Sequence, residues 1–338
     1  MPSLNKLLIV KTTSLGDVVH NLPIIADIRA HFPNITIDWL VEESFADIPR
    51  MHSAFQSNVN NVITVAIRRW RKQLFHRQTW NEMSSLKKQL ASAHYDAVLD
   101  TQGLIKSALI SRLSGINARH GLDKNSAREP LASYFYTNTY AIPRNLHAVA
   151  RNRLLAAAAF GYTNPSTAPN YGLSDIKPTL NEGVSLPTSY IVGLHGTSRD
   201  AKCWPNAYWI ALGLHCQQTG YSLLLPWGNE KERLCAIEIA RKVPLAVILP
   251  KLTISQIACV IANAAAVVGV DTGLVHLAVA LNLPTVAIYT DTDPKLTGVY
   301  PADPSRAVSL GGVNQCPSVT EVWQAIVAMN VKSSIRKW

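Results

Sequence analysis

The residues best suited to chemistry in this chain follow an apolar run in its C-terminal half. Asp271, Thr272 and Gly273 come directly after the β-forming run at 267–270, and His276 lies one helical turn further on. A strand, a tight turn and a helix in this order offer free backbone N–H groups and the positive end of a helix dipole to an anion. The pattern therefore predicts an anion-binding site. A simple helix cap beside a packed histidine would use the same residues.

A second candidate anion site follows the run at 190–195. Thr197, Ser198 and Lys202 supply two hydroxyl groups and a cation in the loop after that run, which suits a diphosphate. The alternative is that Lys202 is an ordinary surface lysine beside Trp204. Both interpretations stay open on these residues alone.

Glu230 follows the next β-rich run, at 222–226. A carboxylate at the end of a strand could bind the diol of a ribose. In the first turn of a helix the same carboxylate is favoured by the helix dipole without any ligand.

In the N-terminal half the candidate catalytic base is Asp17. It comes after the apolar run at 7–10 and the polar loop at 11–16, so we expect it outside the carboxyl end of the first strand. There it could accept a proton from an attacking hydroxyl group. Ser14-x-x-Asp17 also fits a helix-capping arrangement that requires no function, and His20 would share the helical face of Asp17.

A basic amphipathic segment lies between the run at 62–65 and a helix near 82. Ile67, Trp70 and Leu74 recur at helical spacing, and cations occupy the positions between them. Such a segment binds anions or is simply the solvated face of a helix. Its cations are Arg68, Arg69, Arg71 and Lys72, and Arg119, His120, Lys124 and Arg128 form a second basic stretch.

Alternating β-rich and helical runs must position all these residues. Because parallel strands require crossover helices, the alternation predicts a doubly wound parallel sheet in each half of the chain. An apolar helix is expected from Asp17 through Ile28, with Pro23 in an early position, and a closing helix over 319–329. The remaining β-rich runs lie at 36–41, 95–100, 246–249 and 285–288.

The length of 338 residues exceeds the size at which one hydrophobic core stops growing, so two domains are expected. A stretch rich in Pro, Ser, Thr and Asn without sustained periodicity predicts the linker. We therefore assign residues 1–170 to one Rossmann-like domain, 171–188 to the linker and 189–338 to a second Rossmann-like domain with a closing helix.

The composition limits the class of partner. Lys and Arg outnumber Asp and Glu by 32 to 22, a net charge of +10, which favours anionic partners. The five cysteines form neither a CxxC pair nor a zinc spacing, which indicates reduced thiols in the cytoplasm and no structural metal. No apolar stretch is long enough for a membrane span, and the first residues do not form a signal peptide, so any membrane contact is expected to be peripheral.

Eight stretches taken together resemble the lipopolysaccharide heptosyltransferases of glycosyltransferase family 9. They are KTTSLGDVVHNLP, RRWRK, DTQGLIKSAL, SAREPLASYFY, TSRDAKCWP, LPWGNEKER, ILPKLT and VDTGLVHLA, and the likeness runs from the first strand to about residue 300. The resemblance implies the GT-B fold, in which two Rossmann-like domains face each other across a cleft. It implies that residues 1–170 bind the acceptor and that residues 189–338 bind the donor.

The resemblance also implies a reaction. The expected enzyme transfers L-glycero-D-manno-heptose from ADP-L-glycero-β-D-manno-heptose to the inner Kdo of Kdo2-lipid A, with inversion at the anomeric carbon. No metal or cofactor is implied. The expected setting is the cytoplasmic face of the inner membrane, where the protein would bind an anionic surface peripherally and no nucleic acid.

Residue roles follow from the same resemblance. Asp17 matches the family's proposed base, and Lys202 is expected to stabilise the leaving ADP. Ser198 and Leu252 depart from the expected Thr and Met while keeping a hydroxyl group and an apolar contact. The donor site is expected to comprise Thr197, Ser198, Lys202, Glu230, Leu252, Asp271, Thr272, Gly273 and His276. The acceptor is expected to bind Arg68, Arg69, Arg71, Lys72, Lys106 and Arg128.

Three other functions share some of these sequence features. An enzyme that adds the second heptose would share the donor, but the RRWRK and AREPLASYFY stretches favour the first-heptose type. A noncatalytic protein that binds sugar nucleotides or nucleic acid would use the positive charge but not Asp17 and Lys202. A nicotinamide-dependent oxidoreductase is disfavoured because neither half contains GxGxxG.

Overall fold

The computed structural model describes residues 4–56, 59–173 and 185–329. The chain divides into two compact units between Gly172 and Leu173, and each is described by itself. Most of the expected linker, residues 174–184, lies outside the described residues.

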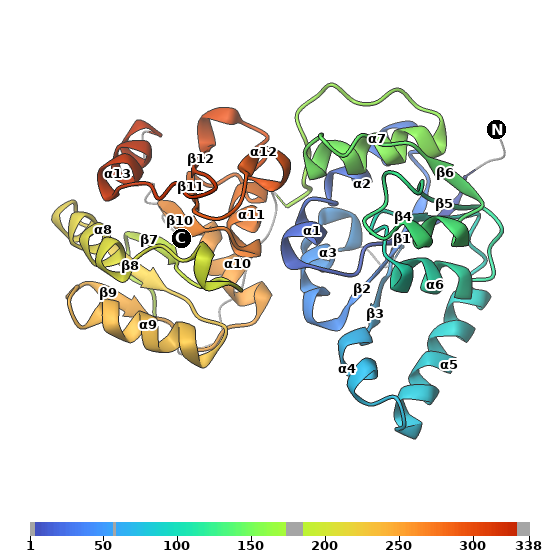
Figure 1. Ribbon diagram of the computed structural model, residues 1–338, viewed down its shortest axis with the longest axis horizontal. Coiled ribbons are helices and arrows are strands. Elements are labelled where there is room, and N and C mark those ends of the chain that lie inside the picture. Colours follow the sequence, from blue (N-terminus) through green and yellow to red (C-terminus); the bar gives the residue numbers. More distant parts are fainter. Residues whose placement is uncertain (1–3, 57–58, 174–184, 330–338) are drawn as a thin grey trace. The chain divides into compact units, whose positions relative to one another are not determined.

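Within the described residues, the N-terminal unit contains a six-stranded parallel sheet in the order β3-β2-β1-β4-β5-β6 (Figure 1). Two strands, β5 and β6, were not predicted. Their sequences, RHGL and NTY, are short and polar, and β6 forms the sheet edge, so they lack the apolar run that marks a buried strand. The strands are β1 (Lys6–Val10), β2 (Thr36–Glu42), β3 (Val62–Val65), β4 (Ala97–Asp100), β5 (Arg119–Leu122) and β6 (Asn138–Tyr140).

Helices lie on both faces of this sheet (Figure 1). Leu8 and Val10 of β1 pack in one core with the helices that follow β3 and β4, so Leu7 and Ile9 point to the other face. On that other side α2 and α7 contact each other, and Arg153 pairs with the buried Asp27 at 2.7 Å. The helices are α2 (Pro23–His31), α3 (Asp47–Met51), α4 (Ile67–Lys72), α5 (Arg77–Ser92), α6 (Ile105–Leu113) and α7 (Ala148–Phe160), with 3₁₀ turns η1 (Glu43–Phe45), η2 (Ser53–Phe55) and η3 (Pro130–Phe135).

The predicted helix from Asp17 through Ile28 is wrong as a single element. It begins earlier, as α1 (Leu15–Val19), and a second helix, α2, starts at Pro23. Proline has no N–H to continue a helix but fits its first turn, so Pro23 starts α2 instead of extending α1.

The C-terminal unit repeats the arrangement. Within the described residues, its sheet has six parallel strands in the order β12-β11-β10-β7-β8-β9. The edge strand β12 was not predicted, because its sequence, AVSLG, is only half buried. The strands are β7 (Tyr190–Leu194), β8 (Ser222–Leu225), β9 (Ala246–Ile248), β10 (Ala266–Val270), β11 (Thr285–Tyr289) and β12 (Ala307–Gly311).

Side chains alternate between two cores along these strands. Val268 and Val270 pack with α8, α9 and α13, whereas Val267 packs with α10 and α11. The closing helix predicted over 319–329 is confirmed as α13. The helices are α8 (Asn206–Gln218), α9 (Glu230–Ala240), α10 (Ile254–Ala262), α11 (Gly273–Ala280), α12 (Pro294–Thr297) and α13 (Val319–Ala328), with 3₁₀ turns η4 (Asp200–Lys202) and η5 (Pro304–Arg306).

The two sheets share one topology. Numbered within its own unit, each has the strand order 3-2-1-4-5-6. In such doubly wound sheets the strand order reverses between strands 1 and 4, and ligands bind outside the carboxyl ends there. The predicted α/β fold of two doubly wound domains is confirmed, and the switch points lie between β1 and β4 and between β7 and β10. Among the described helices, none is both long and apolar enough to cross a membrane.

Candidate functional site

At the switch point of the C-terminal unit, an ion pair joins the loops after β7 and β10. Lys202 Nζ lies 2.5 Å from Asp271 Oδ2, and the two side chains are only 15% and 12% exposed. The hydroxyl of Thr197 donates to the main-chain oxygen of Asp271 at 3.1 Å. The two predicted anion sites are therefore one site, built from neighbouring strand ends.

Asp271 acts within this site as an acceptor for neighbouring side chains. Besides Lys202, the hydroxyl of Thr292 donates to Oδ2 of Asp271, at 2.7 Å. These two donors occupy the oxygen that faces Lys202, so Asp271 orients the lysine. A bound anion would meet the ammonium group rather than this carboxylate.

The helix α11 begins beside the ion pair. Its N-cap residue, Thr272, has extended backbone angles and its side chain makes no capping hydrogen bond. Val275 N donates to the main-chain oxygen of Thr272 at 3.2 Å; the N–H groups before it belong to the helix start, where no carbonyl one turn earlier is available as an intrahelical partner. Gly273 begins the helix, and His276 is buried one turn further on. Helix and lysine together provide the positive potential that a diphosphate requires.

Glu230 and Glu232 both belong to α9, but their carboxylates point in different directions. Glu230 is 62% exposed and pairs with Arg233 at 2.7 Å on the outside of α9. Glu232 turns instead toward the strand end. A Cβ on Gly196 would lie 2.4 Å from the carboxyl carbon of Glu232, so this carboxylate lies directly over Gly196. Its oxygens accept hydrogen bonds from Gly228 N at 2.7 Å and Asn229 Nδ2 at 2.8 Å.

Sequence reasoning missed Glu232 because it lies two residues from Glu230 in a uniformly polar stretch, EKER. The one usable signal was Gly196 directly after a buried strand, which marks a close approach of another group.

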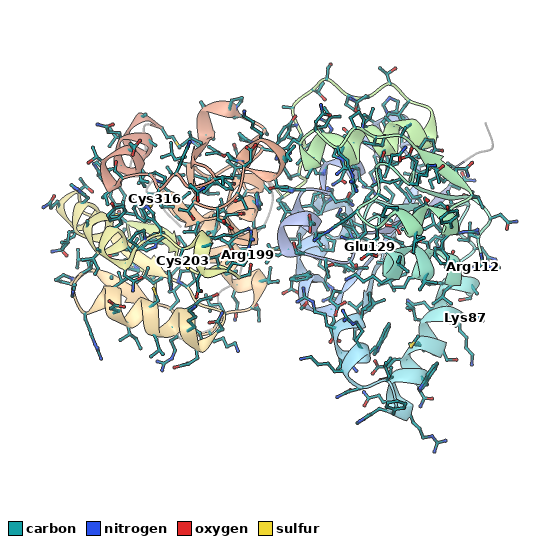
Figure 2. All side chains as sticks on the ribbon, viewed as in Figure 1. Lys87, Arg112, Glu129, Arg199, Cys203 and Cys316 are labelled. Atoms are coloured by element: carbon teal, nitrogen blue, oxygen red, sulfur yellow. The ribbon has the colours of Figure 1, made fainter. Side chains whose placement is uncertain are left out.

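The remaining residues of the predicted donor site lie in the loops after β7 and β9. Ser198 is exposed in the loop after β7, and Leu252, in the loop after β9, packs against the core that contains α10. Trp227 Nε1 donates to the main-chain oxygen of Leu249 at 2.7 Å and so ties the loops after β8 and β9 together. Figure 2 labels Arg199, a further cation of the β7 loop, which pairs with Asp291 at 3.3 Å.

At the switch point of the N-terminal unit, Asp17 closes the first turn of α1. Its Oδ2 accepts hydrogen bonds from the main-chain N–H of Ser14 at 2.8 Å and from the Ser14 hydroxyl at 2.9 Å. Asp17 and Ser14 therefore form the helix-capping arrangement at the start of α1 that their spacing predicted. For the other oxygen, Oδ1, no hydrogen bond is found among the described residues, so the half-buried carboxylate keeps an acceptor for a substrate. His20 is buried against His147, at 5.3 Å between ring centroids.

The loop that carries Asp17 is anchored by the loop after β4. Gln102 Oε1 accepts from the main-chain N–H groups of Thr12 and Thr13, both at 3.1 Å. The buried Asp100 in turn accepts from Gln102 N at 2.8 Å and from Tyr136 Oη at 2.8 Å. This chain of bonds fixes the loop that carries Asp17.

Lys11 is a buried cation at the same strand end, and sequence reasoning did not single it out. Its Nζ donates to the main-chain oxygen of Thr101 at 2.9 Å. Burial lowers the pKa of Lys11, while the carboxylates of Asp17 and Asp100 act in the opposite direction. A lysine directly after a buried β-run, as in LLIVK, was the available signal.

Lys106 reaches the loop of Asp17 from the start of α6. Its Nζ lies 3.4 Å from the hydroxyl oxygen of Thr13. Burial lowers the pKa of Lys106; Glu42 opposes this, and the cations Arg68 and Arg71 lower it further. The charges of Arg68 and Arg71 on α4 therefore act on Lys106 of α6, although they lie more than 30 residues earlier in the chain.

The main chain at Arg128 lies beside Gly103, in the loop after β4. Gly103 has a φ of +64°, which favours glycine, and a Cβ on it would lie 3.5 Å from Arg128 N. The adjacent Glu129 carboxylate accepts from the N–H of Ile105 at 2.7 Å at the start of α6. The side chain of Arg128 is exposed beside this loop.

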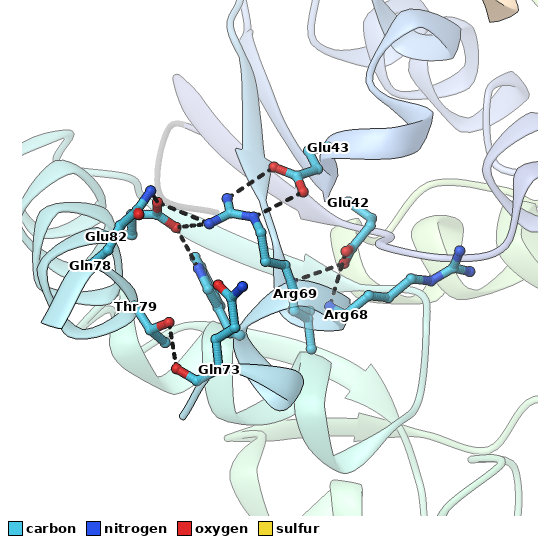
Figure 3. Close-up of polar contacts among 10 residues, drawn as sticks. Glu42, Glu43, Arg68, Arg69, Gln73, Gln78, Thr79 and Glu82 are labelled. Atoms are coloured by element: carbon cyan, nitrogen blue, oxygen red, sulfur yellow. Dashed lines mark hydrogen bonds and ion pairs between the residues drawn. The ribbon is translucent and has the colours of Figure 1, made fainter. Parts of the chain in front are cut away.

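Among the α4 cations, Arg69 already has protein partners (Figure 3). It pairs with Glu43 at 3.2 Å and with Glu82 at 3.0 Å, bridging η1 and α5. Hydrogen bonds from Arg69, and then from Trp70 and Gln78, lower the pKa of Glu82 to about 2. Arg69 is therefore a structural clamp, whatever else it binds.

The other three α4 cations are not neutralised in this way. Arg68 points away from the clamp (Figure 3). Its guanidinium group lies over the ring of Phe45, 5.0 Å from the ring centroid. Within the described residues, no ion pair is found for Arg68, Arg71 or Lys72, and all three are exposed. They remain available to an anionic acceptor.

Comparison with known proteins places the chain among sugar transferases. Residues 83–322 match the model of glycosyltransferase family 9 (heptosyltransferase). The chain is 45% identical over 295 residues to lipopolysaccharide heptosyltransferase 1 of Pseudomonas aeruginosa. This alignment covers 87% of the chain and 81% of the relative.

Solved structures show the same likeness. The E. coli heptosyltransferase WaaC with ADP has a TM-score of 0.86 and 38% identity, covering 96% of this chain and 99% of that one. The E. coli heptosyltransferase WaaC with ADP-2-deoxy-2-fluoro heptose has a TM-score of 0.82 and 37% identity, covering 95% and 99%.

Proposed function

Because this chain belongs to glycosyltransferase family 9, the heptosyltransferases, we propose that it transfers heptose from ADP-heptose to the lipopolysaccharide core. In the finer form of the proposal, L-glycero-D-manno-heptose is added to the inner Kdo of Kdo2-lipid A with inversion at the anomeric carbon. The similar structures were solved with ADP and with an ADP-heptose analogue, which supports the donor.

The observation that carries the donor half is the ion pair between Lys202 and Asp271 at the β7–β10 switch point. We infer that the diphosphate of the donor lies against Lys202 and the start of α11. Asp271 holds the ammonium in place, and the hydroxyls of Thr197 and Ser198 offer further donors. Glu232, rather than Glu230, takes the ribose, because its carboxylate lies at the strand end beside Gly196.

The chemical step needs a base and a stabilised leaving group. Asp17 accepts the proton of the attacking acceptor hydroxyl through Oδ1, while Ser14 holds Oδ2. The acceptor oxygen forms a bond to the anomeric carbon as the bond from that carbon to the phosphate oxygen breaks. The electron pair leaves with ADP, and Lys202 and the dipole of α11 stabilise the charge that develops there.

The acceptor half of the proposal is supported by uncompensated positive charge near Asp17. Lys106 contacts the Asp17 loop, and Arg68 and Arg71 lie within its electrostatic reach. Phosphates and Kdo carboxylates of the acceptor match these cations. We propose that Lys72 and Arg128 extend the same site, and that the protein works peripherally at the anionic cytoplasmic face of the inner membrane.

The test is ADP release from ADP-heptose by the purified protein, with and without de-acylated Kdo2-lipid A. Release that depends on the acceptor, with a heptosylated product, is expected. Acceptor-independent release would indicate hydrolysis, and no release despite ADP binding would contradict the acceptor or the transfer itself. The anomeric configuration of the product decides between inversion and retention.

A further inference from the structure

The turn that joins α4 to α5 exposes large apolar side chains. We call residues 73–80 the α4–α5 tip. Phe75 is 99% exposed, Trp80 61% and Leu74 52%. Figure 1 shows α4 and α5 extending away from the sheet, so the tip lies at the far end of a projection. Three neighbouring apolar groups held in water are unusual on a monomer surface and mark an interaction site.

The tip is an ordered structure. Thr79 is buried, and its hydroxyl donates to the main-chain oxygen of Gln73 at 2.8 Å. Trp80 Nε1 donates to the main-chain oxygen of Leu74, also at 2.8 Å. At its base Arg69 clamps the two helices through its ion pair with Glu82. The apolar side chains are therefore presented by a braced turn, and the exposure is a property of the fold.

The charge around the tip has one sign. Residues 67–80 contain no Asp or Glu. Within this span Arg69 is neutralised by Glu43 and Glu82, whereas Arg71, Lys72 and Arg77 are exposed. Exposed apolar and aromatic side chains with exposed cations next to them in the chain match the chemistry of an anionic lipid surface, in which phosphates lie above hydrocarbon.

We propose that the α4–α5 tip inserts into an anionic lipid bilayer. Leu74, Phe75 and Trp80 enter the boundary between head groups and acyl chains, and Arg71, Lys72 and Arg77 lie at the level of the lipid phosphates. The proposal deepens the proposed function, because it assigns the membrane contact of an enzyme whose acceptor is a lipid. A second copy of this chain is a less suitable partner for the tip, because symmetric pairing would bring the cations of the two copies close together.

Vesicle binding of the full-length protein tests the tip directly. The probe is a phosphatidylcholine vesicle with or without phosphatidylglycerol, and no acceptor lipid is added. Leu74→Ser/Phe75→Ser should weaken partitioning onto the anionic vesicles about tenfold or more, and Phe75→Trp should retain it. The matched control is Leu234→Ser/Val327→Ser, which changes two exposed apolar residues of α9 and α13. Added salt should weaken binding of every form.

Several outcomes would overturn the proposal. Equal binding by the wild type and Leu74→Ser/Phe75→Ser would remove the tip from the interface. Binding only when the acceptor is present in the vesicle would assign the contact to the acceptor. Self-association that the same variant abolishes, without a change in vesicle binding, would assign the tip to a second copy.

A second assay separates this proposal from the proposed function. Transfer to soluble, de-acylated acceptor should be the same for the wild type and Leu74→Ser/Phe75→Ser, whereas transfer to acceptor embedded in anionic vesicles should fall about tenfold. Loss of both activities in the variant would contradict a role confined to the membrane. If the wild type transfers heptose to neither form of the acceptor, the proposed function fails, and the vesicle-binding assay still tests whether the tip contacts the membrane.

Discussion

Lys202 and Asp271 form a 2.5 Å ion pair although 69 residues separate them in the chain. The pair exists because β7 and β10 are neighbours in the sheet, and it leaves the remaining donors of the ammonium group for a ligand. Asp271 therefore serves to hold Lys202 in the orientation that a diphosphate would meet.

Replacing Lys202 with alanine should weaken ADP binding and slow transfer. Loss of a charge-assisted contact corresponds to roughly tenfold or more in the ADP dissociation constant. Calorimetric titration with ADP measures it. Lys231→Ala, which removes an exposed lysine paired with Asp200, is the control and should bind normally. Unchanged ADP affinity in Lys202→Ala would remove this lysine from the phosphate site.

Asp17→Asn should lower turnover by about 10² or more and leave ADP binding nearly intact. Asparagine keeps an oxygen that can accept the hydrogen bonds from Ser14, so the cap of α1 is retained while the base is lost. Single-turnover transfer and ADP titration, with the thermal midpoint as a check on folding, measure the two effects. A variant as fast as the wild type would show that Asp17 only caps the helix.

Glu232→Gln and Glu230→Gln should differ although the residues are two apart. We expect Glu232→Gln to weaken ADP binding about tenfold, because its carboxylate lies over Gly196 at the strand end. Glu230→Gln removes only an exposed ion pair with Arg233 and should bind ADP like the wild type. The reverse ranking in ADP titrations would restore Glu230 to the donor site.

Arg68→Glu and Arg69→Glu should fail in different ways. Arg68 has no ion pair within the described residues, so its reversal should raise the KM for the acceptor about tenfold and leave ADP binding unchanged. Arg69→Glu breaks the bridge to Glu43 and Glu82, so it should also lower the thermal midpoint. Equal loss of ADP binding in Arg68→Glu would indicate a folding defect instead of an acceptor contact.

His52 should remain neutral well below the usual titration range. Burial, and then the charge of Arg29, lower its pKa from 6.5 to about 4. Its Nδ1 accepts from Ala54 N–H at 3.0 Å, which requires the neutral ring. The pKa of His52 is lower in the folded than in the unfolded state, so protonation of His52 lowers the free energy of unfolding. The stability that depends on the neutral ring, about 3 kcal/mol, is fully present above pH 6.5 and is lost as the pH falls toward 4.

An NMR titration of the histidine Cε1–H signals checks this expectation, with His52→Gln identifying the resonance. A midpoint near the ordinary value of 6.5 would contradict it.

The amino-acid sequence by itself determined the alternation of strands and helices, and hence two doubly wound units. It also located the polar residues that follow the strands, because a parallel sheet brings all strand ends to one edge. Asp17, Lys202 and Asp271 could be selected as candidates on that basis. The strands β5, β6 and β12 were missed because they are polar or half buried and carry little of the apolar pattern.

Only the tertiary structure decided which of these residues meet and which way each side chain turns. Lys202 reaches Asp271 because strand order places β10 beside β7, and strand order is not encoded in local periodicity. Glu232 turns toward Gly196, whereas Glu230 pairs with Arg233 on the outside of α9. Arg69 is clamped while Arg68 is not, because Glu43 and Glu82 bind only one of them. Neighbouring polar residues look alike in sequence, and only the packing of distant segments distinguishes them.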